Sequence, residues 1–167
     1  MSFFKIGWYI IYTKPSQEKK MIKDLDRIGI ETYLPITKEK RKWTDRVKII
    51  ACPLFPSYVF VKLTTYMEFY QSTKAKGFVR YLKLGKNLAR VKDSVIENIE
   101  LALNEIDNFE VSSELFPLGK KVVIPKGTFS GLGCEIVSHR GKNKVLVRID
   151  LLNRCLLVNL SKDMLSA

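Results

Sequence analysis

The chain opens with a strand pattern and continues with a helical one. Residues 7–13 are almost all β-branched or aromatic, which is typical of a strand. Met21, Leu25 and Ile28 then recur four and three residues apart with lysines between them, as in an amphipathic helix. Pro15 suits the first position of this helix, because its missing N–H needs no partner there. The pattern predicts a helix from Pro15 that covers one face of a sheet.

Further strands are predicted in the middle of the chain. Residues 32–43 and 46–52 have the pattern of two hairpin arms, and six basic residues fall between Lys38 and Lys48 around the tip. Residues 57–63 are apolar almost without interruption, which predicts a central buried strand. We therefore expect a charged hairpin tip next to a buried sheet.

Two more helices and one strand complete this part of the chain. Residues 68–73 predict a short helix, and residues 78–84 predict a strand. Ser94 and Glu97 have the spacing of a capping box at the start of a second amphipathic helix. The apolar positions of that helix are three and four residues apart, at Ile96, Ile99, Leu103 and Ile106. The order of elements predicts an α+β fold, with an antiparallel sheet flanked by helices.

A different pattern begins after residue 106. Residues 107–117 lose the periodicity, collect acidic and small polar residues and end in a proline, so we expect a linker there. Short β-branched segments separated by glycines follow, at residues 120–124, 134–138, 144–149 and 154–160. About 50 residues of this kind predict a small SH3-like β-barrel. The expected domains are residues 1–106 and 118–167.

The charge of the chain points to a polyanionic partner. Its 167 residues include 29 Lys and Arg against 17 Asp and Glu, a net charge of +12. Such an excess predicts attraction to nucleic acid, although net charge alone identifies no partner. No apolar run has the length of a bilayer span, and residues 1–8 lack a signal-peptide pattern. We expect a cytoplasmic protein without membrane contact.

Residue patterns of catalytic or metal sites are hard to find. Cys52, Cys134 and Cys155 lie far apart without C-x-x-C spacing, and the single histidine, His139, lies beside a basic turn. No phosphate-binding glycine motif occurs, and no carboxylate pair has an apolar setting. The sequence therefore predicts a binding protein that is not an enzyme and uses neither a metal nor a cofactor.

Two residue classes suggest binding surfaces. The aromatic residues of the first domain exceed what its core needs, so they either leave an exposed docking patch or all fill the core. Lysines at the first strand–helix turn, such as Lys14, Lys19 and Lys20, and those of the hairpin tip could hold phosphates or form a solvated face.

Several motifs resemble the transcription factors NusG and RfaH. In the first domain they are Trp8-Tyr9, Tyr12-Thr13-Lys14-Pro15, L-F-P-S-Y-V-F-V at residues 54–61 and G-F-V-R at residues 77–80. Residues 122–147 resemble the KOW motif of the second domain of that family, with its turn at Gly127, Phe129 and Gly131. A glycine in such a turn permits a sharp bend. The resemblance covers nearly the whole chain.

The resemblance implies a transcription elongation or antitermination factor. Such proteins dock on the clamp helices of the largest RNA polymerase subunit and suppress pausing or termination. The matching polymerase-binding positions here are Trp8, Tyr9, Phe55, Tyr58 and Phe60. A loop that bridges to the opposite subunit would fall at residues 70–74, although the histidine-threonine triplet of the family is absent.

The resemblance also implies contacts to nucleic acid and to a further protein. In RfaH-like members the strand–helix turn and the loop before the last strand touch non-template DNA. The matching positions are Lys14, Gln17, Lys20 and Lys76. The KOW domain would bind a small-subunit ribosomal protein or Rho, and the chain is expected to be a monomer.

Two alternatives concern the kind of factor. The motifs Y-T-K-P-x-x-E-K, L-F-P-S-Y-V-F-V and I-D-L-L-N-R look closer to specialised antiterminator paralogues, including those of surface-polysaccharide operons, than to the housekeeping factor. Because KOW barrels also occur in ribosomal proteins, the other reading is an RNA-binding or ribosome-associated protein.

The state of the second domain can be predicted from residue preference. RfaH holds this domain as a helical hairpin against the polymerase-binding surface until DNA releases it. Here residues 122–124, 136–137 and 145–147 are mostly β-branched, and the intervening glycines are unfavourable in a helix. We therefore expect a β-barrel in the free protein that leaves Phe55 and Tyr58 unmasked.

Overall fold

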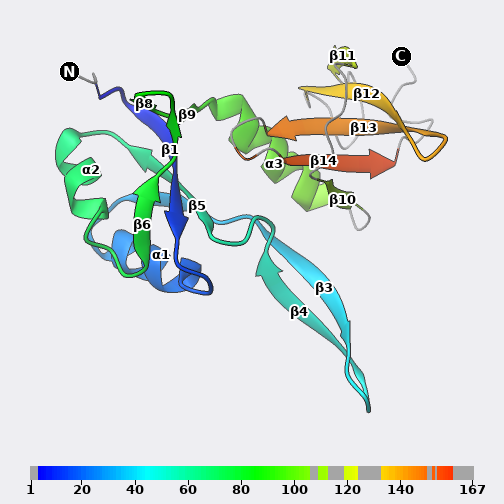
Figure 1. Cartoon of the computed structure of the whole chain (residues 1–167), viewed down its shortest axis with the longest axis horizontal. Helices are drawn as coiled ribbons and strands as arrows, with labels where there is room; N and C mark the ends of the chain where they lie inside the picture. The colour runs from blue at the N-terminus through cyan, green and yellow to red at the C-terminus, as the bar shows by residue number, and fades with distance from the viewer. Residues whose placement is uncertain are drawn as a thin grey trace. The chain divides into compact units, whose positions relative to one another are not determined.

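The computed structural model describes residues 4–105, 109–112, 119–123, 133–149, 152 and 154–159. It divides into two compact units, Met1–Asp93 and Ser94–Ala167, whose elements are labelled in Figure 1. No helix in these described ranges is long and apolar enough to span a membrane.

The first unit is built on an antiparallel sheet, as the sequence predicts. Its central strands are β1 (Gly7–Thr13) and β5 (Tyr58–Leu63), which pair along their whole length. Strand β2 (Glu31–Tyr33) pairs with the other edge of β5. Strands β6 (Phe78–Tyr81) and β9 (Arg90–Val91) both pair with β1. The predicted central position of the 57–63 segment is confirmed.

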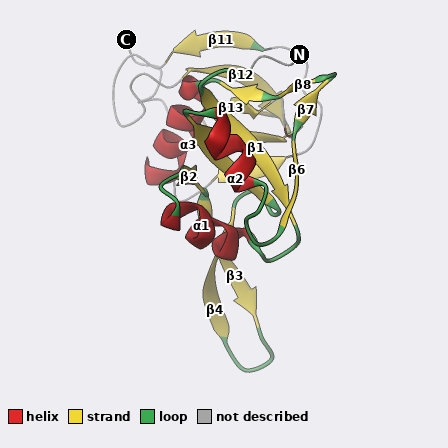
Figure 2. Cartoon of the chain, turned by 90° about the vertical axis from the view of Figure 1, so that its left-hand side faces the viewer, coloured by secondary structure: helices red, strands yellow, loops and turns green. Residues whose placement is uncertain are grey.

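One face of this sheet is covered by α1 (Glu18–Arg27) and α2 (Tyr66–Ser72) (Figure 2). Because side chains alternate along a strand, every second residue of β1 and β5 faces these helices. The resulting core consists of Tyr9, Ile11, Met21, Leu25, Ile30, Val59, Val61, Leu63 and Tyr81. Burial raises the pKa of Tyr81 to about 12, and its hydroxyl is hydrogen-bonded to Ser72.

Helix α1 begins later than the sequence pattern predicts. Ser16 has a φ of 62°, in the left-handed region, so residues 14–17 form a turn and the helix starts at Glu18. Pro15 therefore lies in the turn and not at the first helical position. Ile28 follows the end of the helix and is 46% exposed, so only Met21 and Leu25 of the predicted apolar row are buried.

The expected long hairpin arm is divided in two. Residues up to Tyr33 belong to the main sheet, and a separate ribbon of β3 (Ile36–Lys42) and β4 (Val47–Pro53) follows. Pro35 lies at the break, because proline has no N–H to continue a ladder. Figures 1 and 2 both show the ribbon projecting away from the rest of the first unit.

The segment after β6 also breaks earlier than expected. The predicted strand of residues 78–84 ends at Tyr81, and a small hairpin of β7 (Lys83–Leu84) and β8 (Asn87–Leu88) follows. Gly85 in its turn has a φ of 65°, a conformation that glycine adopts without a steric cost.

Within the described helices, the predicted capping box at the start of the third helix is absent, and one forms at the start of α2 instead. Helix α3 (Asp93–Glu105) starts one residue before Ser94, so Ser94 lies in the first turn and not at the cap. A capping box is instead present on α2, where Thr65 and Glu68 bond each other's backbone N–H groups. The spacing Thr65-x-x-Glu68 fits this box, whereas a capping box is predicted above only at Ser94 and Glu97.

The second unit holds a five-stranded antiparallel sheet in the order β10-β14-β13-β12-β11. Its members are β10 (Phe109–Ser112), β11 (Lys120–Val123), β12 (Gly133–His139), β13 (Lys142–Ile149) and β14 (Arg154–Asn159). The strands predicted for residues 120–160 are confirmed. The turn between β12 and β13 is two residues long, Arg140 and Gly141, both with positive φ, which suits a hairpin.

Two expectations about the second unit are not confirmed. Strand β10 lies within the expected linker of residues 107–117, because Phe109 and Val111 alternate with polar residues and pair with β14. The KOW turn residues Gly127, Phe129 and Gly131 lie outside the described residues. Closure of the sheet into a barrel and the domain boundary at residue 106 stay predictions.

Candidate functional site

The end of β1 is held between two loops that are distant in sequence. The backbone N–H of Thr13 donates to the carbonyl of Ser57 at 2.8 Å, and that of Lys14 donates to the carbonyl of Gly77 at 2.8 Å. The strand–helix turn at residues 14–17 is therefore fixed against the loop before β6. Lys14, within this turn, has an exposed side chain.

Gly77 lets these two loops touch. A methyl group at this position would lie 2.5 Å from Cβ of Gln17, and the φ of Gly77 is 82°. A side chain would therefore both clash with Gln17 and strain the backbone. The half-buried Gln17 consequently packs directly on the Gly77 backbone.

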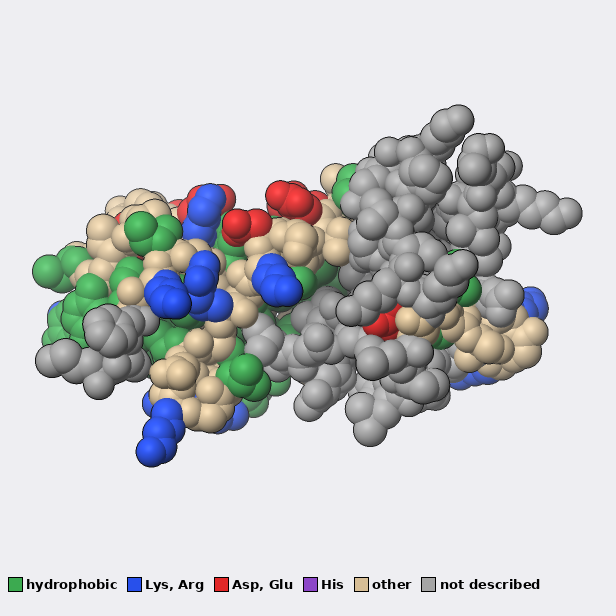
Figure 3. Space-filling model, turned by 90° about the horizontal axis from the view of Figure 1, so that it is seen from above, with side chains coloured by type: hydrophobic (Ala, Val, Ile, Leu, Met, Phe, Trp, Pro, Cys, Tyr) green, Lys and Arg blue, Asp and Glu red, His purple; other side chains and the backbone are tan. Residues whose placement is uncertain are grey.

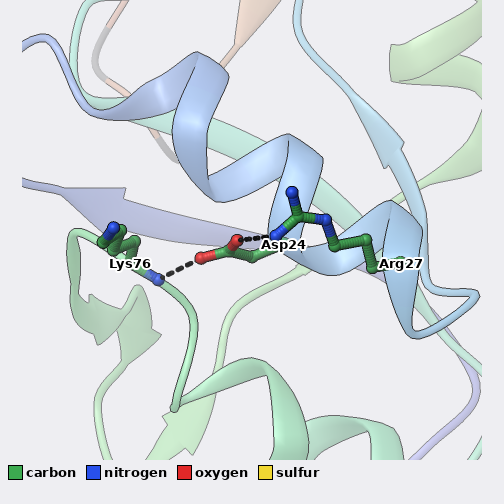
Figure 4. Close-up of polar contacts among 3 residues, drawn as sticks. All are labelled: Asp24, Arg27 and Lys76. Atoms are coloured by element: carbon green, nitrogen blue, oxygen red, sulfur yellow. Dashed lines mark hydrogen bonds and ion pairs between the residues drawn. The ribbon is translucent and has the colours of Figure 1, made fainter.

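A carboxylate on α1 holds the same loop from the other side. Oδ2 of Asp24 accepts a hydrogen bond of 3.0 Å from the backbone N–H of Lys76 (Figure 4). Oδ1 of the same group faces Nη1 of Arg27 at 3.5 Å. Asp24 thus links α1 to the loop that carries Lys76.

The residues predicted to contact nucleic acid are brought together by these bonds. Lys14, Gln17 and Lys76 lie on the two joined loops, and Lys20 follows Gln17 by one turn of α1. The three lysine side chains are exposed. No ion pair engages their ammonium groups within the described part of the chain. The arrangement places three exposed lysines on adjoining segments of the chain, which we call the lysine cluster.

A buried glutamate supports the base of the lysine cluster. Glu18 is 5% exposed, and its Oε1 accepts a hydrogen bond of 2.7 Å from the backbone N–H of Ser57. Ser57 has a φ of 69°, so this bond holds a turn that is otherwise unfavourable for a serine. Glu18 therefore fixes the turn to which Thr13 is bonded.

Four of the five predicted polymerase-binding residues lie together. Opposite residues of an antiparallel strand pair lie on the same face of the sheet. Tyr58 lies opposite Tyr12 and Phe60 lies opposite Ile10, so all four side chains are on one face. Trp8 is on the same face of β1, and the Phe55 and Phe60 ring centroids are 6.4 Å apart. We call Trp8, Phe55, Tyr58 and Phe60 the aromatic face.

Tyr9 is separated from the aromatic face. It points to the opposite side of the sheet, into the core under α1 and α2, where it is 2% exposed. Its hydroxyl donates to the backbone carbonyl of Lys5. The alternation of side chains along β1 explains the difference, because neighbouring residues cannot face the same side.

The exposure of the aromatic face bears on the two interpretations of the aromatic residues, an exposed docking patch or a filled core. Trp8, Phe55 and Phe60 are 7%, 3% and 0% exposed, so these rings are buried and not available as freely exposed anchors. Tyr58 is half-buried, and its ring centroid lies 5.5 Å from that of Tyr12. The Arg80 guanidinium lies 5.6 Å from the Tyr12 ring. The accessible part of this face is therefore the Tyr12–Tyr58 pair.

Exposed apolar side chains occur instead around α2. Tyr66, Met67 and Tyr70 are 67%, 61% and 54% exposed, and the Lys74 ammonium lies 4.5 Å from the Tyr70 ring. In Figure 3 hydrophobic side chains gather at the left-hand end, with Lys and Arg side chains beside them. The end of α2 and the residues after it, 70–74, are where the resemblance places the bridging loop.

One face of the projecting ribbon carries a row of lysines. Lys38, Lys40 and Lys42 alternate along β3 and lie opposite Ala51, Ile49 and Val47 of β4. Each residue of a strand rises about 3.4 Å, so the lysines follow one another at about 7 Å. Glu39 is on the other face, where it pairs with Arg41 at 3.6 Å. The lysine row is exposed and has no acidic neighbour on its own face of the ribbon.

Comparison with known proteins gives the family. The family model described as "Transcription termination factor nusG" matches residues 7–100, which is more than half of the chain. The chain belongs to the NusG family. These proteins are transcription factors and not enzymes, so the prediction of a non-enzymatic protein is confirmed.

The NusG relatives match along most of the chain. "Transcription termination/antitermination protein NusG" of Chlamydia trachomatis is 26% identical over 85% of this chain and 85% of its own length. The protein of the same name from Lactococcus lactis is 25% identical over 94% of this chain and 90% of its own length. The solved structure titled "Domain interaction in Thermotoga maritima NusG" is 25% identical, with a TM-score of 0.50 over 93% of this chain and 94% of that one. This protein is thus a NusG-like transcription termination or antitermination factor.

Two supporting residues of this NusG-family site are missing from the sequence-based assignment. Glu18 and Asp24 bind backbone N–H groups 39 and 52 residues away in the chain. In the sequence, Glu18 and Asp24 look like ordinary polar residues on the solvent-facing side of an amphipathic helix. The one signal for Glu18 was its place within the motif Y-T-K-P-x-x-E-K, and nothing in the pattern indicated Asp24.

Proposed function

We propose that this protein binds elongating RNA polymerase and the exposed non-template DNA strand, and that it acts as an antiterminator of the RfaH-like type. The polymerase would be held at the clamp helices of its largest subunit through the Tyr12–Tyr58 pair, the accessible part of the aromatic face, and the DNA through the lysine cluster. The clustering of Lys14, Gln17, Lys20 and Lys76 is the observation that carries the DNA part of the proposal.

The chemistry of the lysine cluster favours a phosphate backbone as its ligand. Ammonium groups without an ion-pair partner keep their full attraction for phosphate, and contacts of this kind position a protein on nucleic acid. Gln17 adds an amide that can donate to and accept from a base edge. Its position between Lys14 and Lys20 would place that amide among the phosphate contacts.

The aromatic face favours a protein partner at Tyr58. Tyrosine at the centre of an interface supplies a large contact area with little loss of side-chain entropy. The buried rings of Trp8, Phe55 and Phe60 would support the Tyr12–Tyr58 pair from below. The family's relation to transcription supports RNA polymerase as that partner.

The second unit would couple transcription to a further factor through its KOW sheet. A small-subunit ribosomal protein or Rho is the partner that the resemblance suggests. Affinity capture of the full chain from lysate at low salt tests the polymerase assignment, with recovery of polymerase subunits as the expected result. Recovery of ribosomal subunits without polymerase would favour the RNA-binding alternative.

The lysine cluster is tested by removing its charges. The combined variant Lys14→Ala, Lys20→Ala and Lys76→Ala should reduce the salt slope of single-stranded DNA binding by up to about three phosphate contacts. A control variant removes the three exposed lysines Lys83, Lys86 and Lys92. Lys92 follows β9, which pairs with the start of β1, at the opposite end of that strand from Lys14, and Lys83 and Lys86 lie in the β7–β8 hairpin. Equal slopes for both variants would contradict the proposal.

A further inference from the structure

In the loop before β6, one backbone N–H group, that of Lys76, donates its hydrogen bond to a side chain of α1. The N–H groups of Lys74, Ala75 and Phe78 donate to carbonyls within residues 71–75. The N–H of Lys76 donates instead across to Oδ2 of Asp24, at 3.0 Å. Figure 4 shows the carboxylate directed from α1 to this loop. Lys76 is thus placed by a side chain 52 residues away in the sequence.

The charge of Asp24 opposes phosphate binding at this place. The carboxylate lies one helical turn after Lys20 and beside the backbone of Lys76. A negative charge there lowers the local attraction for a polyanion. If charge were its whole effect, removing it would strengthen binding to nucleic acid.

We propose that Asp24 is a positioning residue for the nucleic-acid contact of the lysine cluster. Its carboxylate holds the Lys76 backbone so that the Lys76 ammonium lies on the same surface as those of Lys14 and Lys20. The bond from Lys14 to the Gly77 carbonyl fixes the next residue of the loop, so the two bonds together orient Lys76. This inference rests on the proposed function of the lysine cluster.

Two substitutions of Asp24 separate position from charge. Asp24→Ala removes both the acceptor and the charge, whereas Asp24→Asn keeps a side-chain oxygen that can accept the Lys76 N–H. In the full chain, Asp24→Ala should weaken binding of single-stranded DNA about threefold or more and reduce the salt slope by about one phosphate contact. Asp24→Asn should bind as tightly as the unchanged protein or more tightly. Equal or stronger binding by Asp24→Ala would overturn the proposal.

A background lacking the Lys76 ammonium distinguishes positioning from a general effect on the fold. In the Lys76→Ala protein, Asp24→Ala should cause no further loss of affinity, because nothing remains to be positioned. A structural role would produce the same loss in both backgrounds, and that result would also overturn the proposal. Alanine favours a helix at this half-buried position, so both proteins should fold.

Hydrogen exchange supplies a readout that does not depend on DNA. The Lys76 amide should exchange faster in Asp24→Ala and stay protected in Asp24→Asn. Unchanged exchange in Asp24→Ala would contradict the anchoring bond itself. If Lys76→Ala alone leaves DNA binding unchanged, the proposed function of the cluster is wrong. If Lys76→Ala weakens binding and Asp24→Ala does not, only the positioning role is wrong.

Discussion

At the scale of single residues, burial separates support from contact within the aromatic face. Phe55 is 3% exposed and packs against Phe60, whereas Tyr58 is half-buried beside Tyr12. Loss of a buried phenyl ring leaves a cavity, and loss of a surface tyrosine removes contact area for a partner. The same substitution should therefore have different results at the two positions.

Phe55→Ala should destabilise the fold by about 3 kcal/mol or more, because the cavity cost of a buried Phe is of that order. Tyr58→Ala should instead weaken polymerase binding by about 2 kcal/mol and leave the melting transition nearly unchanged. Thermal melting together with binding to purified polymerase measures both effects. Tyr58→Phe keeps the ring and is the matched control. A large loss of stability in Tyr58→Ala would place this ring in the core.

At the scale of elements, periodicity predicted the main sheet and the strands of the second unit. Residues 57–63 read as a central strand because apolar residues continue through it, and β5 confirms this. The α1 helix was predicted in type but not in its first residue, since Ser16 adopts a left-handed conformation that periodicity does not reveal. Strand β10 was missed because its four residues lie among acidic and small polar residues that end in a proline, a composition typical of a linker.

The parts of the site that periodicity could not predict are its long-range bonds. A pattern of apolar positions shows which face of α1 is buried but not which backbone group a polar side chain binds. Asp24 and Glu18 each bond to a distant loop, and Gly77 is required by the approach of Gln17. The motif resemblance assigned Lys14, Gln17, Lys20 and Lys76 to one function, and the fold supplies the physical reason for their proximity.

The projecting ribbon should add a second contact to nucleic acid. A two-stranded ribbon fits the major groove of a duplex, and Lys38, Lys40 and Lys42 follow one another at about 7 Å on one of its faces. Replacing these three lysines with alanine should weaken duplex DNA binding and reduce its salt slope by up to about three contacts.

The other face of the ribbon provides the control for charge. Replacing Arg41, Arg46 and Lys48 with alanine removes the same formal charge from exposed positions, and Arg41 already pairs with Glu39. We expect a smaller change of slope for this variant. Indistinguishable slopes for the two faces would mean that the ribbon acts only through its net charge.

At the scale of the whole molecule, the net charge of +12 comes from the first unit, because Met1–Asp93 has 20 Lys and Arg against 8 Asp and Glu, whereas Ser94–Ala167 has nine of each. A nucleic-acid partner is therefore attracted chiefly to the first unit, which raises encounter rates at low salt. The specific contacts in the first unit would then determine where the protein binds on the nucleic acid, since net charge alone does not. The relatives match along most of the chain, and the family model covers residues 7–100.

The last prediction concerns the state of the second unit in the intact chain. Residues 142–149 and 154–159 form strands β13 and β14, which pair along their length. Valine, isoleucine and the Arg140-Gly141 turn favour this state, because β-branched residues lose side-chain freedom in a helix and glycine costs about 1 kcal/mol there. Backbone chemical shifts of the full-length protein should therefore be those of strands over both segments. Helical shifts for these residues would show a hairpin of the RfaH type, in which the second unit must refold before the factor acts.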